Sequence, residues 1–133
     1  MAESERVVLE TSDGQMSDVI QISTQIQAKI QELDRALAQV ALRADSKAIA
    51  IAEYEKVLAI TILKLKNGKD MELGGERVGT SPVSVMEKIA KGICWQEKLA
   101  MEKADAQYKN LMAGLKVCEA QMNALQSIFR HMS

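Results

Sequence analysis

The sequence contains few of the residues on which thick cores and active sites usually depend. Its 133 residues include one histidine, one proline and two cysteines, and aromatic residues make up only 3%. Compact globular cores normally contain large aromatic rings, whereas alanine, leucine, isoleucine and methionine suffice for the narrow seam between two helices. The scarcity of aromatic residues therefore favours a thin helical assembly over a compact globule.

The shortage of histidine and cysteine also bears on catalysis and metal binding. His131 has neither Cys94 nor Cys118 near it in the sequence, so no group of ligands has the spacing of a metal site. A serine nucleophile would need a base within hydrogen-bond reach, and His131 is the only histidine. No glycine-rich phosphate-binding motif occurs. We therefore expect no catalytic residues, no metal and no cofactor, and a protein that is not an enzyme.

An excess of one charge and long apolar runs are absent as well. The 17 basic and 18 acidic residues leave a net charge of −1, which gives no general attraction to nucleic acid or to anionic membranes. No apolar stretch approaches the length of a membrane span, and MAESERVV does not resemble a secretory signal. These absences predict a cytoplasmic protein with reduced cysteines and no membrane partner.

Apolar residues at helical spacing are what the sequence does contain. Two long rows step by three or four residues, which places each row on one face of a helix. The two rows predict an all-α fold, a long antiparallel two-helix hairpin that resembles a coiled coil. The first row is Val19, Ile22, Ile26, Ile30, Leu33, Leu37, Val40, Ala44, Ala48, Ile51, Tyr54 and Leu58; the second is Met86, Ile89, Ile93, Ala100, Ala104, Tyr108, Leu111, Leu115, Cys118, Met122, Leu125, Phe129 and Met132.

The width of these rows bears on assembly. Each row is broadened by flanking apolar residues, among them Ile20, Ile49 and Leu99. A face of that width normally serves a bundle of three or more helices. We therefore expect the hairpin to form a homodimer or a higher oligomer, with a dimeric four-helix bundle as the smallest arrangement.

Turn and capping signals divide the chain into segments. Residues 1–15 form a polar lead-in, and residues 16–133 form one helical-hairpin domain with helices over 17–60 and 82–131. Between the helices, residues 61–66 and 69–73 alternate apolar with polar side chains around Asn67-Gly68, which is a strong β-hairpin signal. We expect a small β-hairpin and loop over 61–80 at the tip. Ser81 is the expected N-cap of the second helix, with Pro82 at its first position.

Two groups of residues are candidates for binding. The tip carries the basic residues Lys64, Lys66, Lys69 and Arg77, which either protect an edge strand from aggregation or contact phosphate groups or an acidic protein. The second group surrounds the only tryptophan. Trp95 points roughly 200° away from Ile93, so it either anchors another molecule or caps the base of the hairpin. The partner-binding candidates there are Trp95, Ile93, Lys91 and Lys98.

Three segments of the chain resemble a known family. They are YEKVLAITILKLKNG, VMEKIAKGICWQEKLAMEKADAQYKNL and QMNALQSIFRHM, and their most specific part is the run from Glu87 to Trp95. Over roughly residues 50–132 the chain resembles a family of small early-region proteins of Gram-positive phages and prophages. The resemblance implies a gene context near single-strand annealing recombination proteins, where proteins commonly assist recombination or block host nucleases and defence systems. It implies no catalytic residues.

Three functions remain open at this stage. The first is a non-enzymatic phage accessory protein, in the host cytoplasm, that binds and modulates a host or phage protein such as a nuclease or a defence complex, with inhibition as the expected effect. The second is a binder of nucleic acid or of a nucleotide, as a recombination accessory or a nucleotide-sequestering oligomer. The third is a purely structural assembly element. The near-neutral charge favours the first over the second.

Overall fold

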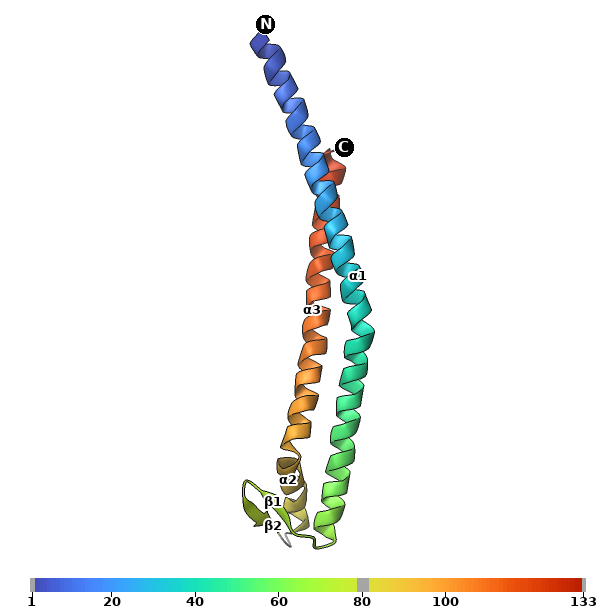
Figure 1. The fold of residues 1–133 in the computed structure, drawn as a ribbon, viewed down its shortest axis with the longest axis vertical. Coiled ribbons are helices and arrows are strands. Elements are labelled where there is room, and N and C mark those ends of the chain that lie inside the picture. Colours follow the sequence, from blue (N-terminus) through green and yellow to red (C-terminus); the bar gives the residue numbers. More distant parts are fainter. Residues whose placement is uncertain (1, 79–81, 133) are drawn as a thin grey trace. The chain divides into compact units, whose positions relative to one another are not determined.

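The computed structural model describes residues 2–78 and 82–132, with side chains from Gly14 onward except that of Gln15. The described elements are α1 (Ala2–Lys66), β1 (Met71–Leu73), β2 (Glu76–Val78), α2 (Val83–Ile93) and α3 (Trp95–Met132). The predicted helical hairpin with a small antiparallel sheet is therefore confirmed (Figure 1). The chain divides into two compact units. The terminal unit comprises residues 1–39 and 111–133, and the tip unit comprises residues 40–110.

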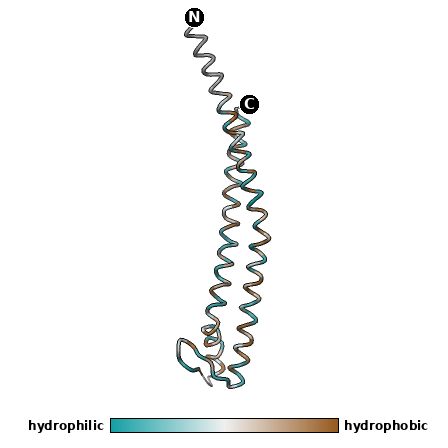
Figure 2. The backbone as a smooth tube through the Cα atoms, viewed as in Figure 1, coloured by the Kyte–Doolittle hydropathy of each residue, from teal (hydrophilic) through white to brown (hydrophobic). Residues whose placement is uncertain are grey.

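In the terminal unit, the first part of α1 packs against the last part of α3. The side chains that turn inward on α3 are those predicted, with Leu115 only 6% exposed and Cys118 only 5% exposed. The Cys118 thiol lies 3.9 Å from the carbonyl oxygen of Lys29, to which it donates a weak hydrogen bond. The apolar positions recur along both helices of this unit (Figure 2), as the spacing of the rows predicts.

The helix α1 begins earlier than expected. It starts at Ala2, so residues 2–16 are helical, and the prediction of a non-helical lead-in before a helix at residue 17 is wrong. The β-branched run Val7-Val8 lowers helix propensity by only a few tenths of a kcal/mol per residue. Extending an existing helix fixes one residue per added hydrogen bond and needs no new nucleus, which explains why this local preference is overridden.

The inward face of α1 also differs from the predicted row. In the terminal unit the partly buried positions are 19, 22, 23, 26, 29, 33 and 36, so Lys29 and Ala36 occupy places that the prediction gave to Ile30 and Leu37. Ile30 is 44% exposed and Leu37 is 58% exposed. Farther along, in the tip unit, Ala44 and Ala48 are also exposed. Both registers satisfy a spacing of about 3.5 residues, so the contact with α3 selects between two adjacent columns of one broad apolar face.

In the tip unit, α1 continues through residues 61–66, which were expected to form a strand; that prediction is wrong. Helical spacing places Thr61 and Leu65 on one face, and they are 4% and 1% exposed. Leu63, which a strand would place beside Leu65, is 60% exposed. The Thr61 hydroxyl donates to the carbonyl oxygen of Val57 at 2.8 Å, which satisfies a polar group that would otherwise be buried without a partner.

Asn67-Gly68 ends α1 instead of turning a β-hairpin. Gly68 has a φ of 72°, its N–H donates to the carbonyl of Leu65, and the Lys69 N–H donates to the carbonyl of Lys64. This pair of bonds is the Schellman motif, which satisfies carbonyls left free at a helix end. The expected positive φ occurs at Gly68 but not at Asn67, and it ends a helix instead of forming the turn of a β-hairpin.

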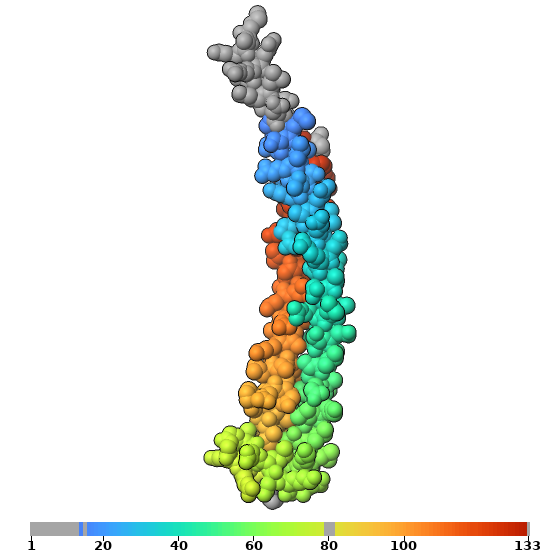
Figure 3. Space-filling model, in the orientation of Figure 1, coloured from blue at the N-terminus to red at the C-terminus, as the bar shows by residue number. Residues whose placement is uncertain are grey.

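The β-hairpin lies later than expected: β1 falls within residues 69–73, which were predicted as the second strand, and β2 lies where a loop was expected. Met71 pairs with Val78 and Leu73 with Glu76. Gly74 and Gly75, with φ values of 60° and 82°, form the two-residue turn between them. Positive φ at both positions is characteristic of a type I′ turn, which suits the twist of paired strands. The β-hairpin packs beside α2 in the tip unit (Figure 1), and the yellow-green residues of this region protrude at the lower left of the space-filling view (Figure 3).

A small apolar core joins these elements. Leu65, Met86 and Ala90 form its buried centre, and Leu58, Ile62, Met71, Ile89 and Ile93 pack around them. A Cβ at Gly92 would lie 3.2 Å from Cδ2 of Leu73. The absence of a side chain at Gly92 therefore lets the β-hairpin approach α2 closely. The core therefore fixes the hairpin to the helices of the tip unit.

The predicted second helix is divided into two. Pro82 is the N-cap residue of α2, not its first residue, and the expected cap Ser81 lies outside the described residues. The helix α2 ends at Ile93, and its C-cap residue Cys94 has a φ of −88° and a ψ of 26°. The Cys94 N–H still donates to Ala90, and its carbonyl still accepts from Lys98. The interruption is therefore local.

Polar contacts connect α1 and α3 inside the tip unit. Lys47 lies 3.0 Å from the Asp105 carboxylate, which Lys109 also approaches to 2.9 Å. The Lys47 ammonium group is also 5.0 Å from the centre of the Tyr108 ring. Hydrogen bonds from Lys109 and then Lys47 hold the pKa of Asp105 below its ordinary value, and the same contact raises the pKa of Lys109.

This network predicts one feature of the acid dependence of stability. Because the pKa of Asp105 is lowered by folding, its contribution is fully present above the unfolded pKa and is lost as the pH falls through the folded one. We expect Asp105→Asn to lower the thermal midpoint at neutral pH and to have little effect in strong acid. Melting curves of the two proteins across pH test this; a constant difference down to the lowest pH would contradict it.

Two glycines predict opposite effects of the same substitution. Gly68→Ala should lower stability by about 1 kcal/mol because L residues rarely adopt its positive φ. Gly114 lies within α3, and a Cβ added there would meet open space, so Gly114→Ala should raise stability by about 0.5–1 kcal/mol. Urea denaturation measures both. Equal signs for the two variants would contradict the assigned end of α1.

Candidate functional site

The strongest candidate surface is at the start of α3. Trp95 is 56% exposed, and Leu99, one helical turn later, is 46% exposed. The adjacent Cys94 is fully buried, with its sulfur 3.4 Å from the Thr61 hydroxyl oxygen. Cys94 turns toward α1, and a step of about 100° to the next residue takes the Trp95 side chain off that face and into solvent. We call Trp95, Lys98 and Leu99 the tryptophan surface.

The structure retains part of the candidate set expected around Trp95. Lys98 is exposed beside it, whereas Ile93 is half-buried and packs against the tip core. Lys91 is exposed and lies 3.3 Å from Glu87, with which it forms an ion pair on α2. Leu99 was expected to broaden the inward row. Its i,i+4 spacing from Trp95 is the signal that could have placed it on this surface.

The basic candidates of the tip are all exposed, but on different elements. Lys64 and Lys66 lie in the last turn of α1, Lys69 follows the helix end, and Arg77 is on β2 opposite Glu72. Cations at a helix C-terminus interact favourably with the helix dipole. Lys64 and Lys66 can therefore stabilise the C-terminal end of α1. They do not protect an edge strand, because residues 61–66 are helical.

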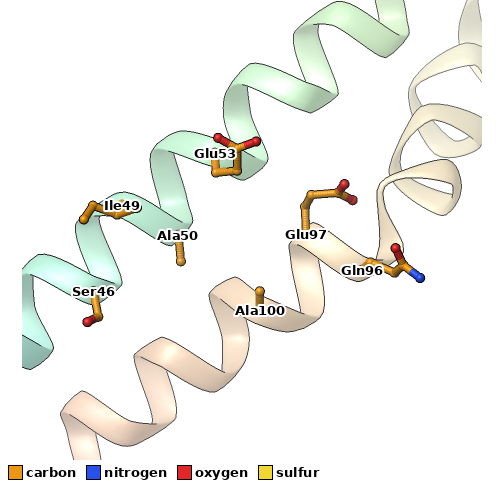
Figure 4. A pocket seen from close by; sticks show the side chains of 7 residues that line it. All are labelled: Ser46, Ile49, Ala50, Glu53, Gln96, Glu97 and Ala100. Carbon is orange, nitrogen blue, oxygen red and sulfur yellow. The ribbon is translucent and has the colours of Figure 1, made fainter.

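A shallow groove of about 470 Å³ lies between α1 and α3 within the tip unit. Ala50 and Ala100 point toward one another across it, and Glu53 and Glu97 lie at one end (Figure 4). Small side chains on both helices leave this space open. The remaining lining residues are Ser46, Ile49 and Gln96.

The groups that could support chemistry are engaged elsewhere. His131 Nδ1 lies 2.8 Å from the carbonyl oxygen of Ser127 in the preceding turn, to which its N–H donates. Cys94 and Cys118 are both buried as free thiols. Since the Thr61 hydrogen is directed at Val57, the Cys94 thiol is the donor to Thr61. Within residues 2–78 and 82–132, no group of three or more histidine, cysteine or acidic residues is arranged to hold a metal ion.

Comparisons with protein-family models, with curated proteins and with solved structures found no match to this chain. Across the described residues, no helix has a stretch long and apolar enough to cross a membrane.

Proposed function

We propose that this chain is a non-enzymatic phage accessory protein that binds and inhibits a host or phage protein, such as a nuclease or a defence complex, in the bacterial cytoplasm. The observation that carries the proposal is the exposure of Trp95 and Leu99 on adjacent turns of α3. Tryptophan is strongly enriched among the residues that dominate protein–protein binding. The resemblance to early-region phage proteins supplies the class of target.

The tryptophan surface offers apolar area that a partner can cover. An exposed indole beside an exposed leucine gains binding energy when a partner removes both from water. Lys98 adds a positive charge at the edge of this patch, which suits an acidic neighbour on the target. Within the tip unit, α1 covers the inward face of α3, and the tryptophan surface lies outside that face. It therefore remains available to a partner while the helical hairpin is folded.

The test is a binding titration against a target first captured from host lysate and then purified. We expect saturable binding and inhibition of the target's activity, and we expect Trp95→Ala to weaken binding at least tenfold with unchanged helicity. Val83→Ala is the matched control, because Val83 is 74% exposed on α2. Equal binding by wild type and Trp95→Ala would contradict the proposal.

Binding to nucleic acid is the outcome that would replace it. A protein held by phosphate contacts loses affinity steeply as salt rises, because counterions are released on binding. We expect little or no DNA binding near physiological salt, since Lys64, Lys66 and Lys69 have no aromatic side chain among them to stack a base. Fluorescence anisotropy with labelled single- and double-stranded DNA measures this. Salt-sensitive binding that is abolished by changing these lysines to glutamate would favour the nucleic-acid alternative.

A further inference from the structure

An exposed apolar face runs along α1 in the terminal unit. It consists of Met16, Ile20, Ile30 and Leu37, which we call the outer apolar face, and they are 63%, 62%, 44% and 58% exposed. Met16, Ile30 and Leu37 are separated by multiples of seven residues, and Ile20 follows Met16 by one helical turn. Residues seven apart lie on nearly the same side of a helix. These side chains therefore line one side of α1, next to the face that α3 covers.

The outer apolar face belongs to a coiled-coil pattern that the hairpin uses only in part. Positions 16, 23, 30 and 37 form one heptad column, and Val19, Ile26 and Leu33 form a second column at steps of three and four from the first. All of these residues are apolar except Ser23. The second column is partly buried, whereas the first is exposed at every position but Ser23. One of the two columns is thus left without a covering helix in the terminal unit.

We propose that the outer apolar face binds the same face of a second copy of this chain, in an antiparallel helix–helix seam. A two-fold interface requires one surface patch to be complementary to itself. A row with a seven-residue repeat meets this requirement, because it matches another helix with the same repeat.

The residues that interrupt the row select the antiparallel direction. When the two helices run in opposite directions about a centre between residues 26 and 27, Met16 of one copy lies opposite Leu37 of the other. Ser23 then lies opposite Ile30, so a small side chain meets a large one, as close packing requires. A parallel pairing would instead place Ser23 opposite Ser23 and leave a gap at the seam.

The charge of Asp34 also favours the antiparallel direction. Asp34 is exposed one turn after Ile30, and a parallel pairing would bring the two Asp34 carboxylates together, which is repulsive. The antiparallel pairing separates them by about 22 Å along the helix, which exceeds the screening length of about 8 Å at physiological salt. Asp34 is the one charge in the column that also holds Ile20, Gln27 and Ala41, and the column beyond it carries none: Ser17, Thr24, Gln31 and Ala38.

The length of the face suffices for such a seam. Residues 16–37 span about 33 Å of helix at 1.5 Å per residue, and they make up about three heptads, a length at which the pattern indicates a coiled coil. Neither Trp95 nor Leu99 belongs to this face. The seam and the tryptophan surface can therefore be tested separately.

The first experiment compares two matched double variants by light scattering at micromolar concentration. Wild type should have at least twice the 14.6 kDa chain mass. Ile30→Gln with Leu37→Gln should raise the dimer dissociation constant at least tenfold. Leu42→Gln with Ile49→Gln should not change it, although this pair is also one leucine and one isoleucine seven residues apart, 59% and 68% exposed.

The second experiment tests the direction of the seam by disulfide cross-linking. Met16→Cys and Leu37→Cys are prepared as separate variants, and the native Cys94 and Cys118 are buried. Under mild oxidation, an equal mixture of the two should form a cross-linked dimer that contains one copy of each. Cross-links that form only within each variant alone would indicate a parallel pairing and would overturn the proposed direction.

One further variant and a helicity check make the result specific to the seam. Trp95→Ala should leave the mass unchanged, so failure of the tryptophan surface and failure of the seam are distinguishable. Circular dichroism checks that the variants keep their helicity; if the double variant loses it, Leu37→Ala alone should still raise the dissociation constant. A monomeric wild type, a dimer that survives Ile30→Gln with Leu37→Gln, or equal dissociation of both double variants would overturn the proposal.

Discussion

Leu65→Ala should lower the free energy of unfolding by about 2–5 kcal/mol, as expected when a buried leucine is replaced by a smaller side chain. Leu65 is 1% exposed at the centre of the tip core, in contact with α2 and the apolar residues around it. The substitution would leave a cavity where α1, α2 and β1 meet. Chemical denaturation by urea measures the loss.

Leu63→Ala is the matched control for this prediction. Leu63 lies two residues earlier on α1 and is 60% exposed, so its truncation should change stability by less than about 0.5 kcal/mol. The pair also tests the secondary structure, because a β-strand would place residues 63 and 65 on the same face. Similar losses for the two variants would contradict the helical assignment of residues 61–66.

Leu115→Ala should have a comparable effect in the terminal unit, about 2–5 kcal/mol. Leu115 is 6% exposed on the face that α3 turns toward α1. Val117→Ala is the control, since Val117 is 57% exposed on the same helix. Thermal denaturation followed by circular dichroism compares them. Equal shifts would show that the register between α1 and α3 differs from the one described.

The sequence predicted the parts of the fold that depend on long periodic patterns. The row from Leu111 to Phe129 places the inward face of α3 correctly, because many residues contribute to one hydrophobic period. The same reasoning could not choose between Ile30 and Lys29 for the inward face of α1. Both columns fit the period, and only the position of α3 decides which one is covered.

Local signals were less reliable where two structures use the same backbone geometry. Asn67-Gly68 suits a type I′ turn, but it also suits the end of a helix, since both need positive φ. The continuing helix α1 favoured the second. Gly74-Gly75 then supplied the turn of the real hairpin. Such choices depend on tertiary contacts, here those around Leu65, that no short segment contains.

The candidate site could be predicted only in part. The single tryptophan identified the start of α3, and Lys98 was correctly placed on the surface beside it. Ile93 packs partly against the tip core, because the interruption at Cys94 separates the contacts of α2 from those of α3. Leu99 joins the surface because it follows Trp95 by one helical turn, on the side of α3 that α1 does not cover.

Quenching of Trp95 fluorescence tests the central claim most directly, because Trp95 is the only tryptophan. In the protein without its target, acrylamide should quench the emission readily, as expected for a side chain that is 56% exposed. When a purified target without tryptophan at the contact is added to saturation, we expect the quenching constant to fall several-fold and the emission to shift to shorter wavelength. Unchanged quenching in the saturated complex would show that the target binds elsewhere and would contradict the proposed surface.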